Sequence, residues 1–174
     1  MPQPSLKPLI SSRKIHKRVQ ELGREISANL SGSPLTILAL LDGAFCFVAD
    51  LARAIDQPDV TLRFIRATSY GRNIVSSGQV KLEEMPDLSG HTVLLVDDIL
   101  DTGRTLQAAK IALAGATVYT CVLLNKPMRR VPDGLQIADY IGFTIPDVFV
   151  VGYGLDFDGH YRHLPDIRKV VSEK

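Results

Sequence analysis

The stretch VLLVDDILDTGRTL, from Val93 to Leu106, decides the fold. Its four apolar residues, Val93 to Val96, form an unbroken hydrophobic run. Such a run predicts a strand that is buried on both faces of a parallel sheet. The chain then turns acidic at Asp97 and Asp98, where this strand is expected to emerge. A short polar loop, residues 101 to 105, follows, and residues 106 to 114 have the pattern of a helix.

This strand, loop and helix junction is the place where ligands bind in open α/β sheets. Its small residues allow backbone N–H groups and hydroxyls to surround a phosphate at the positive end of a helix. The carboxylates of Asp97 and Asp98 would repel a phosphate unless a divalent cation or a ligand with hydroxyl groups lies between them. A sugar phosphate that binds together with Mg²⁺ satisfies both conditions.

Two other ligand-binding motifs are excluded on the same residues. A Walker P-loop needs a lysine after its second glycine, whereas only Gly103 is present and Arg104 follows it. A receiver domain also carries a strand that ends in two aspartates. The chain after Asp97 is too short for such a domain and shows no later aspartate suited to accept a phosphoryl group.

Composition indicates one ordinary globular domain. The chain has 174 residues, of which 45% are hydrophobic and 22% charged, and its net charge of +1 gives no electrostatic case for binding nucleic acid. Cys46 and Cys121 lie in apolar contexts and are expected to be buried thiols in a reducing compartment. Met1 to Pro8 lacks the apolar core of a signal peptide, and no stretch is long and apolar enough to cross a membrane, so a cytoplasmic location is expected.

The rest of the chain alternates between helical and strand patterns. Ile15, Val19, Leu22, Ile26 and Leu30 form the stripe of an amphipathic helix, which Gly32 and Pro34 end. Further strands are expected at 35–41, 60–68, 79–82, 117–124 and 138–145, and a second helix at 45–55.

For several residues, the sequence alone allows a purely structural role as well as a functional one. From the residues alone, Asp42-Gly43 is as well explained by a simple turn as by a second phosphate loop, and Lys126 by surface charge. Residues 69–78 have no burial pattern and fit either a lid or a disordered loop. The DFDG segment at 156–159 lacks the glutamate of a calcium loop, and His160 and His163 lack the further ligands of a zinc site.

Four motifs in the correct order resemble the 6-oxopurine, hypoxanthine-guanine type of the type I phosphoribosyltransferases. They are the central stretch, LLDGAF at 40–45, the Ser69-Tyr70 pair, and FVVGYGLD at 149–156, with Lys126 and the Tyr161-Arg162 pair between and after them. The resemblance covers residues 35 to 164. It implies an α/β fold with a five-stranded parallel sheet flanked by helices, in one domain of residues 1–174. A small hood would come from the N-terminal segment and roughly residues 127–174.

The resemblance also implies a role for each matching residue. Ribose and the 5'-phosphate of phosphoribosyl pyrophosphate (PRPP) would bind to Asp97, Asp98, Asp101, Thr102, Gly103, Arg104 and Thr105. Asp101 would also be the general base. Pyrophosphate would contact Leu41, Asp42, Gly43 and Arg162, with a non-proline cis peptide at Leu41-Asp42, and Ser69 and Tyr70 would form a lid. Many relatives have lysine where Asp42 stands, so a contact made by that lysine is not carried over. The purine would contact Lys126, Phe149, Val150 and Asp156, and Mg²⁺ would lie near Asp97, Asp98 and Asp156.

The activity that the resemblance implies is purine salvage. The 5-phosphoribosyl group would pass from PRPP to hypoxanthine or guanine, with Mg²⁺, by an oxocarbenium-like displacement of pyrophosphate. The alternative is a regulator of the same fold that senses PRPP or nucleotides and binds nucleic acid. Lys126 favours a 6-oxo acceptor over a 6-amino donor, so adenine is a poorer candidate. We expect small-molecule substrates, no nucleic-acid or membrane partner, and a homodimer or homotetramer.

Overall fold

A computed structural model describes residues 4–69 and 80–171 of the chain. The main sheet has six strands in the order β4-β3-β2-β5-β6-β7. Five of them are parallel: β3 (Val60–Ser69), β2 (Leu35–Leu41), β5 (Thr92–Leu100), β6 (Thr117–Asn125) and β7 (Tyr140–Thr144). The short β4 (Val80–Leu82), expected as a strand at 79–82, pairs antiparallel with the end of β3. The predicted five-stranded parallel sheet is therefore confirmed.

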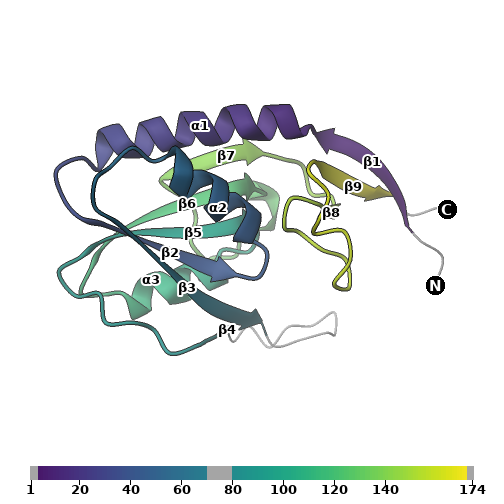
Figure 1. The fold of residues 1–174 in the computed structure, drawn as a ribbon. Coiled ribbons are helices and arrows are strands. Elements are labelled where there is room, and N and C mark those ends of the chain that lie inside the picture. Colours follow the sequence, from purple (N-terminus) through teal and green to yellow (C-terminus); the bar gives the residue numbers. More distant parts are fainter. Residues whose placement is uncertain (1–3, 70–79, 172–174) are drawn as a thin grey trace.

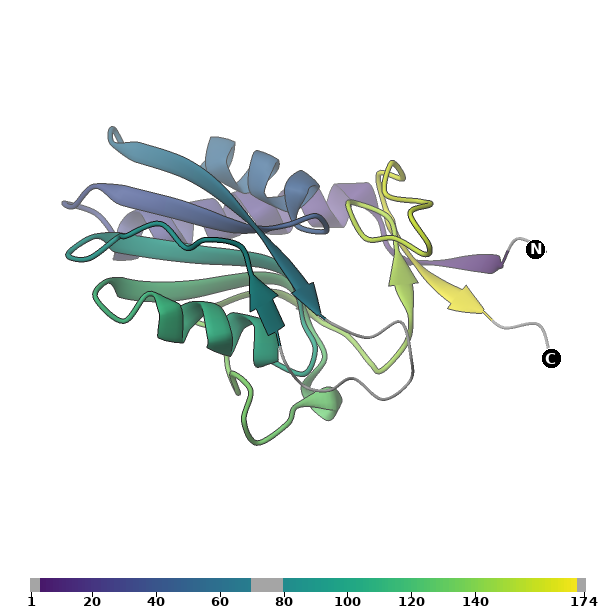
Figure 2. The same ribbon diagram turned by 90° about the horizontal axis from the view of Figure 1, so that it is seen from below.

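Helices cover both faces of this sheet (Figures 1 and 2). Helices α1 (Ser12–Asn29) and α2 (Phe45–Ala54) lie on one face and α3 (Arg104–Ala112) lies on the other. Each face has its own hydrophobic core, and neighbouring residues of β2 alternate between them, with Ile37 in one and Leu38 in the other. Both faces are thus apolar, which explains why the strands are unbroken hydrophobic runs.

The predicted first helix is present and its apolar stripe is buried. Ser11 caps the N-terminus of α1, where its hydroxyl accepts a hydrogen bond from the backbone N–H of Lys14. Such a cap stabilises a helix by about 1 kcal/mol. The stripe residues Ile15, Val19, Leu22 and Ile26 are all buried against the sheet and α2.

A second, three-stranded sheet joins the two ends of the chain. It has the order β1-β9-β8, formed by β1 (Ser5–Ile10), β9 (Ile167–Val171) and β8 (Val150–Val151). The arrowheads of the parallel strands point toward this small sheet (Figure 1), which therefore stands at the ligand-binding edge. The single-domain boundary with a hood stays a prediction, but both chain ends do contribute to this small sheet.

The elements differ from expectation in four respects. β1 and β9 were not expected as strands. β5 continues four residues beyond Val96, so Asp97 and Asp98 lie within the strand and not after it. Helix α3 begins at Arg104, two residues earlier than expected. A short 3-10 helix, η1 (Pro127–Arg129), overlaps residues 128–136, which were expected to be a loop because of the turn signals Pro132 and Asp133-Gly134.

Candidate active site

The turn between β5 and α3 leads into a helix end that lacks a side-chain cap within the described residues. Gly103 is the N-cap of α3 and has a φ of +84°, a conformation that favours glycine. The first turn of the helix has no acidic residue, and no side chain caps its end. Thr102 Oγ1 accepts only a long hydrogen bond, 3.4 Å, from Arg104 N. A helix end with this chemistry is suited to bind an anion.

A second loop braces this turn. Leu135 N donates a 2.9 Å hydrogen bond to Gly103 O, and Arg104 Nε lies 3.2 Å from Asp133 Oδ2. A Cβ added at Gly103 would overlap the backbone of Leu135, and one at Gly134 would overlap Thr102 O. The two loops therefore fit only because glycines stand at the contact.

Asp97 and Asp98 place two carboxyl groups next to each other beside the turn. Both are partly buried, and Asp98 N donates a 2.9 Å hydrogen bond to Asp97 Oδ1. Burial, and then the negative charge of Asp98, raise the pKa of Asp97 well above its ordinary value. Burial also raises the pKa of Asp98, against the opposing effect of hydrogen bonds and of the Arg162 charge. The pair therefore favours a proton, a cation or a hydroxyl donor in its vicinity.

The loop after β2 packs against this acidic pair. The peptide bond between Leu41 and Asp42 is cis, as the resemblance implies. A Cβ added at Gly43 would overlap Asp98 Oδ2, and one added at Gly154 would overlap Gly43 O. Three distant segments of the sequence, at residues 42–43, 97–98 and 154, therefore meet at one point.

Arg162 comes to the same place from the loop between β8 and β9. Its Nη1 donates a 2.7 Å hydrogen bond to Gly154 O, and its Nη2 lies 2.9 Å from Asp156 Oδ1. The other carboxylate oxygen of Asp156 accepts a 2.7 Å hydrogen bond from Gly159 N. The structure thus places Arg162 and Asp156 together, with the charge of Arg162 near Asp98.

Asp101 carries an acceptor oxygen that lacks a hydrogen-bond donor within the part of the chain that the structure describes. This atom, Oδ1, is shielded from solvent. Arg129 Nε lies 2.9 Å away as an ion-pair partner, but the geometry is not that of a hydrogen bond. The guanidinium of Arg129 also lies 3.4 Å from Asp147. Asp101 is therefore held next to a cation, and its Oδ1 receives no hydrogen bond from the described residues.

Arg130 ties the turn to the end of β6. Its guanidinium donates to Leu100 O at 2.6 Å and to Lys126 O at 3.2 Å, and it also contacts Asp101 O and Asn125 Oδ1. Burial lowers the pKa of this guanidinium. Arg129 and Arg130 were missed as site residues because their segment was assigned to a loop. Two consecutive arginines directly after Lys126-Pro127 were the available signal.

The expected base-binding residues differ in exposure. The side chain of Lys126 is only 7% exposed, and no carboxylate of residues 4–69 or 80–171 lies within ion-pair distance of its ammonium. Phe149 is 53% exposed, so it is not a core aromatic residue. Its ring packs edge-to-face against the ring of Phe157, with 5.7 Å between the ring centroids. Val150 is buried in β8. A buried cation and an exposed ring are both suited to contact a polar aromatic ligand.

The structure bears only in part on two further expectations, the lid and the metal site. Ser69 is the last residue of β3, while its expected lid partner Tyr70 lies outside the described residues. Among the described residues no group of three or more histidine, cysteine or acidic side chains is placed to hold a metal ion. Asp97, Asp98 and Asp156 therefore do not form a closed cage of protein ligands.

The helices that the structure describes include none that is long and apolar enough to span a membrane.

The acidic pair gives a testable pH dependence. Because the pKa of Asp97 is raised on folding, the folded state binds a proton more tightly than the unfolded state. The free energy of unfolding therefore falls as pH rises from the ordinary aspartate range through the raised pKa. Asn at this position keeps the acceptor for Asp98 N and carries no charge, so Asp97→Asn should raise the melting temperature near neutral pH and have less effect near about pH 4.

Thermal melts of Asp97→Asn across this pH range test the pKa assignment. Asp87→Asn is the control, because hydrogen bonds from Ser89 lower the pKa of Asp87 and the sign of its effect is opposite. A lower melting temperature for Asp97→Asn at neutral pH would contradict the raised pKa.

Comparisons with known proteins agree with this geometry. The family model described as "Phosphoribosyl transferase domain" matches residues 8–158. A hypoxanthine-guanine phosphoribosyltransferase of Aquifex aeolicus is 43% identical over 171 residues, which cover 95% of this chain and 94% of that protein. A hypoxanthine phosphoribosyltransferase of Salmonella typhimurium is 41% identical over 94% of both chains.

Solved structures give the same result. The crystal structure of a hypoxanthine-guanine phosphoribosyltransferase from Bacillus anthracis matches with a TM-score of 0.87 and 39% identity, over 97% of this chain and 100% of that chain. A hypoxanthine phosphoribosyltransferase from Staphylococcus aureus matches with a TM-score of 0.86 and 33% identity, over 95% and 91% of the two chains. The chain therefore belongs to the phosphoribosyltransferase family, in its hypoxanthine-guanine branch.

Proposed function

We propose that this protein is a purine salvage enzyme that transfers the 5-phosphoribosyl group from PRPP to hypoxanthine or guanine. The products are IMP or GMP and pyrophosphate. The observation that carries the proposal is the meeting of the acidic pair, the Gly43 loop and Arg162 at the strand edge where β5 leads into the turn before α3. The names of the relatives at about 40% identity support the same substrates.

The sugar phosphate fits the turn and the acidic pair. The N–H groups at the start of α3 and the hydroxyls of Thr102 and Thr105 would bind the 5'-phosphate, with Arg104 adding positive charge. Asp97 and Asp98 would accept hydrogen bonds from the ribose hydroxyls. Those hydroxyls would replace the proton that the pair otherwise favours, so the raised pKa of Asp97 is consistent with a site built for such a ligand.

The leaving group fits the other side of the acidic pair. Breaking the bond at the anomeric carbon leaves positive charge on the sugar and negative charge on pyrophosphate. Arg162 and the backbone of Leu41, Asp42 and Gly43 would stabilise the pyrophosphate. Asp97 and Asp98 would stabilise the oxocarbenium-like sugar. Preorganised charges of this kind supply a large share of enzymatic rate enhancement.

Asp101 is the general base in this proposal. It would take the proton from the imidazole nitrogen of the purine as that ring attacks the sugar. The carboxylate of Asp101 would be the acceptor, and Arg129, whose Nε lies 2.9 Å from Oδ1, would hold it in place. The guanidinium of Arg130 contacts the backbone carbonyls of both Asp101 and Lys126 and so holds the two residues in a fixed relation.

The purine would lie between the ring of Phe149 and the ammonium of Lys126. Lys126 would donate to the 6-oxo group, and the backbone of Val150 and the segment near Asp156 would read the remaining base edge. A 6-amino group offers no acceptor in the same place, so we expect adenine to react poorly.

Mg²⁺ is the proposed cofactor. When bound with PRPP it supplies positive charge for the departing pyrophosphate. Asp97, Asp98 and Asp156 are the residues that would hold it, directly or through water. The absence of a three-ligand cage among the described residues fits an ion that keeps part of its hydration shell and is shared with substrate phosphates.

Phe149→Ala gives a direct test of base stacking. Stacking of an aromatic ring on a base contributes about 1–3 kcal/mol, so the KM for hypoxanthine should rise by about 5- to 150-fold. The KM for PRPP should change little, because the phosphates bind elsewhere. Steady-state rates with each substrate varied measure both values. Phe64→Ala is the control, since Phe64 is similarly exposed at 49% but lies on β3. Equal effects of the two variants on hypoxanthine would contradict the stacking role.

Initial rates with Mg²⁺, PRPP and each of hypoxanthine, guanine, xanthine and adenine test the proposed activity. We expect nucleotide from hypoxanthine, from guanine or from both, and little from adenine. A nucleic-acid shift assay on the same sample tests the regulator alternative. No nucleotide from any base would overturn the proposal. We also propose a homodimer or homotetramer, which sedimentation equilibrium would measure.

A further inference from the structure

An ion pair stands at the edge of the pyrophosphate loop, formed by two residues on neighbouring strands. Arg66 Nε of β3 lies 3.5 Å from Asp42 Oδ1, which directly follows β2. The register of the two parallel strands pairs Leu41 with Arg66, so this contact comes from the last paired position of β2. The guanidinium is thus carried to the carboxyl edge of the sheet, beside the loop that packs on Asp98.

This pair contributes little to the stability of the fold. The side chains of Arg66 and Asp42 are 62% and 54% exposed. An exposed pair of this kind is typically worth about 0–1 kcal/mol. The contact is also not a hydrogen bond, and within residues 4–69 and 80–171 Arg66 has no other carboxylate partner. Within those residues its terminal nitrogens, Nη1 and Nη2, have no carboxylate partner, which suits them to bind an anionic ligand at this edge.

The backbone of Arg66, in contrast, is firmly placed. Arg66 N donates a 3.2 Å hydrogen bond to Glu83 Oε2, and Glu83 N donates a 3.0 Å hydrogen bond to Arg66 O. On its other side the strand pairs with β2. A flexible guanidinium on a fixed backbone suits capture of an anion with little cost in ordering the main chain.

The local charges also require a cation here. Asp42 precedes Gly43 and Asp98 packs against it, with Asp97 beside Asp98, at the place where the proposed reaction releases pyrophosphate. Arg162 is the cation on the hood side, and it is already paired with Asp156. Arg66 is the cation that the structure places on the side of Asp42.

We propose that Arg66 is a pyrophosphate-binding residue, which donates hydrogen bonds to the leaving group while Asp42 orients its guanidinium. This inference rests on the proposed function and adds a residue to the same site. A simpler possibility is that Arg66 only neutralises Asp42. The two possibilities predict different pyrophosphate affinities for a variant that lacks both the Arg66 and the Asp42 charge.

The test is calorimetric titration of pyrophosphate with Mg²⁺ into the wild type, Arg66→Gln, and the double variant Asp42→Asn with Arg66→Gln. Hydrogen bonds from a cation to an anion are strong, so Arg66→Gln should weaken binding by about 10-fold or more. The double variant removes the unpaired carboxylate yet still lacks the donors, so it should stay several-fold weaker than the wild type. Binding by the double variant equal to that of the wild type would overturn the proposal, as would unchanged binding by Arg66→Gln.

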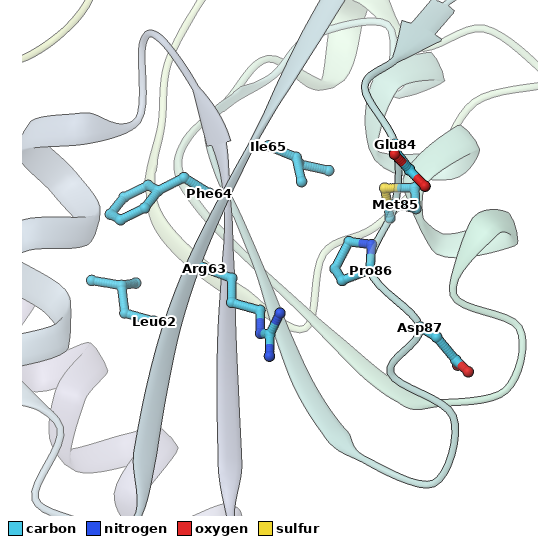
Figure 3. A pocket seen from close by; sticks show the side chains of 8 residues that line it. All are labelled: Leu62, Arg63, Phe64, Ile65, Glu84, Met85, Pro86 and Asp87. Atoms are coloured by element: carbon cyan, nitrogen blue, oxygen red, sulfur yellow. The ribbon is translucent and has the colours of Figure 1, made fainter.

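Arg63→Gln is the matched control. Arg63 lies three residues earlier on β3, and so on the opposite face of the strand, where it lines a surface groove with residues 84–87 (Figure 3). It should bind pyrophosphate as the wild type does. Arg66→Lys, which keeps the charge but not the planar guanidinium, should fall between the wild type and Arg66→Gln. Melting temperatures of all variants should agree closely, because both arginines are exposed.

The same samples separate this inference from the proposed function. If the wild type forms no nucleotide, the proposed function fails. If the wild type forms nucleotide while Arg66→Gln binds pyrophosphate equally well, only the role of Arg66 fails.

Discussion

Asp101→Asn should lower kcat by about 10²- to 10⁴-fold, the range that positioned acid-base catalysis contributes. Asn is of nearly the same size and keeps an acceptor oxygen, but it cannot take a proton from the purine. The carboxylate of Asp101, whose Oδ1 receives no hydrogen bond from the described residues, is the group that would be lost as a base. The KM for PRPP should change little, because the phosphate is bound by the start of α3 and not by this carboxylate.

Asp147→Asn is the control for this substitution. Asp147 contacts the same guanidinium, since Arg129 Nη1 lies 3.4 Å from its Oδ1. Removal of its charge disturbs Arg129 without removing the proposed base, so kcat should stay close to that of the wild type. Steady-state and single-turnover rates measure both variants. An Asp101→Asn variant that is folded and turns over at nearly the wild-type rate would show that another group accepts the proton.

Gly103→Ala should weaken PRPP binding by about 100-fold, because a displacement of about 1 Å in a positioning loop can have an effect of this size. Two causes act together. The φ of +84° disfavours any residue with a Cβ, and the added Cβ would overlap the backbone of Leu135. The turn and the loop that braces it must therefore separate, which moves the N–H groups at the start of α3.

Gly90→Ala separates these two causes. Gly90 also has a positive φ, +78°, but nothing lies within 4 Å of a Cβ built there. Both variants should lose a similar amount of stability from the backbone conformation, about 1–2 kcal/mol. Only Gly103→Ala should lose PRPP affinity, which fluorescence or calorimetric titration would measure. Equal PRPP affinity in the two variants would mean that the turn before α3 does not bind the phosphate.

The sequence was most informative where burial on both faces leaves an unbroken apolar run. The strands at 35–41, 93–96 and 117–124 were predicted in this way, although the run at 93–96 is shorter than β5. The strand at 60–68 was predicted from its alternation of residue types instead, and its residues 61–64 are exposed. Beyond Val96, β5 pairs with β6 but no longer with β2, so polar residues become acceptable in the strand. The predicted start of helix α3 was too late because its first turn carries the polar residues Arg104 and Thr105, whereas the prediction began at the first apolar residue, Leu106.

The missed features depend on partners that are distant in sequence. β1 contains Pro8 and pairs with β9 from the other end of the chain, so neither strand has a clear local pattern. Arg66, Arg129 and Arg130 were not expected at the site. Only the structure shows their contacts, with Asp42, Asp101 and the carbonyl of Leu100, respectively. The cis peptide at Leu41-Asp42 was predicted from the resemblance and is confirmed.

The central claim is that the acidic pair and the turn before α3 bind a phosphorylated ribose whose base lies against Phe149. A crystal structure of the protein with IMP tests this claim most directly. We expect the ribose hydroxyls within hydrogen-bond distance of Asp97 and Asp98, and the 5'-phosphate at the N–H groups of residues 103–106. A nucleotide bound at any other place on the sheet, with this turn free of phosphate, would contradict the account.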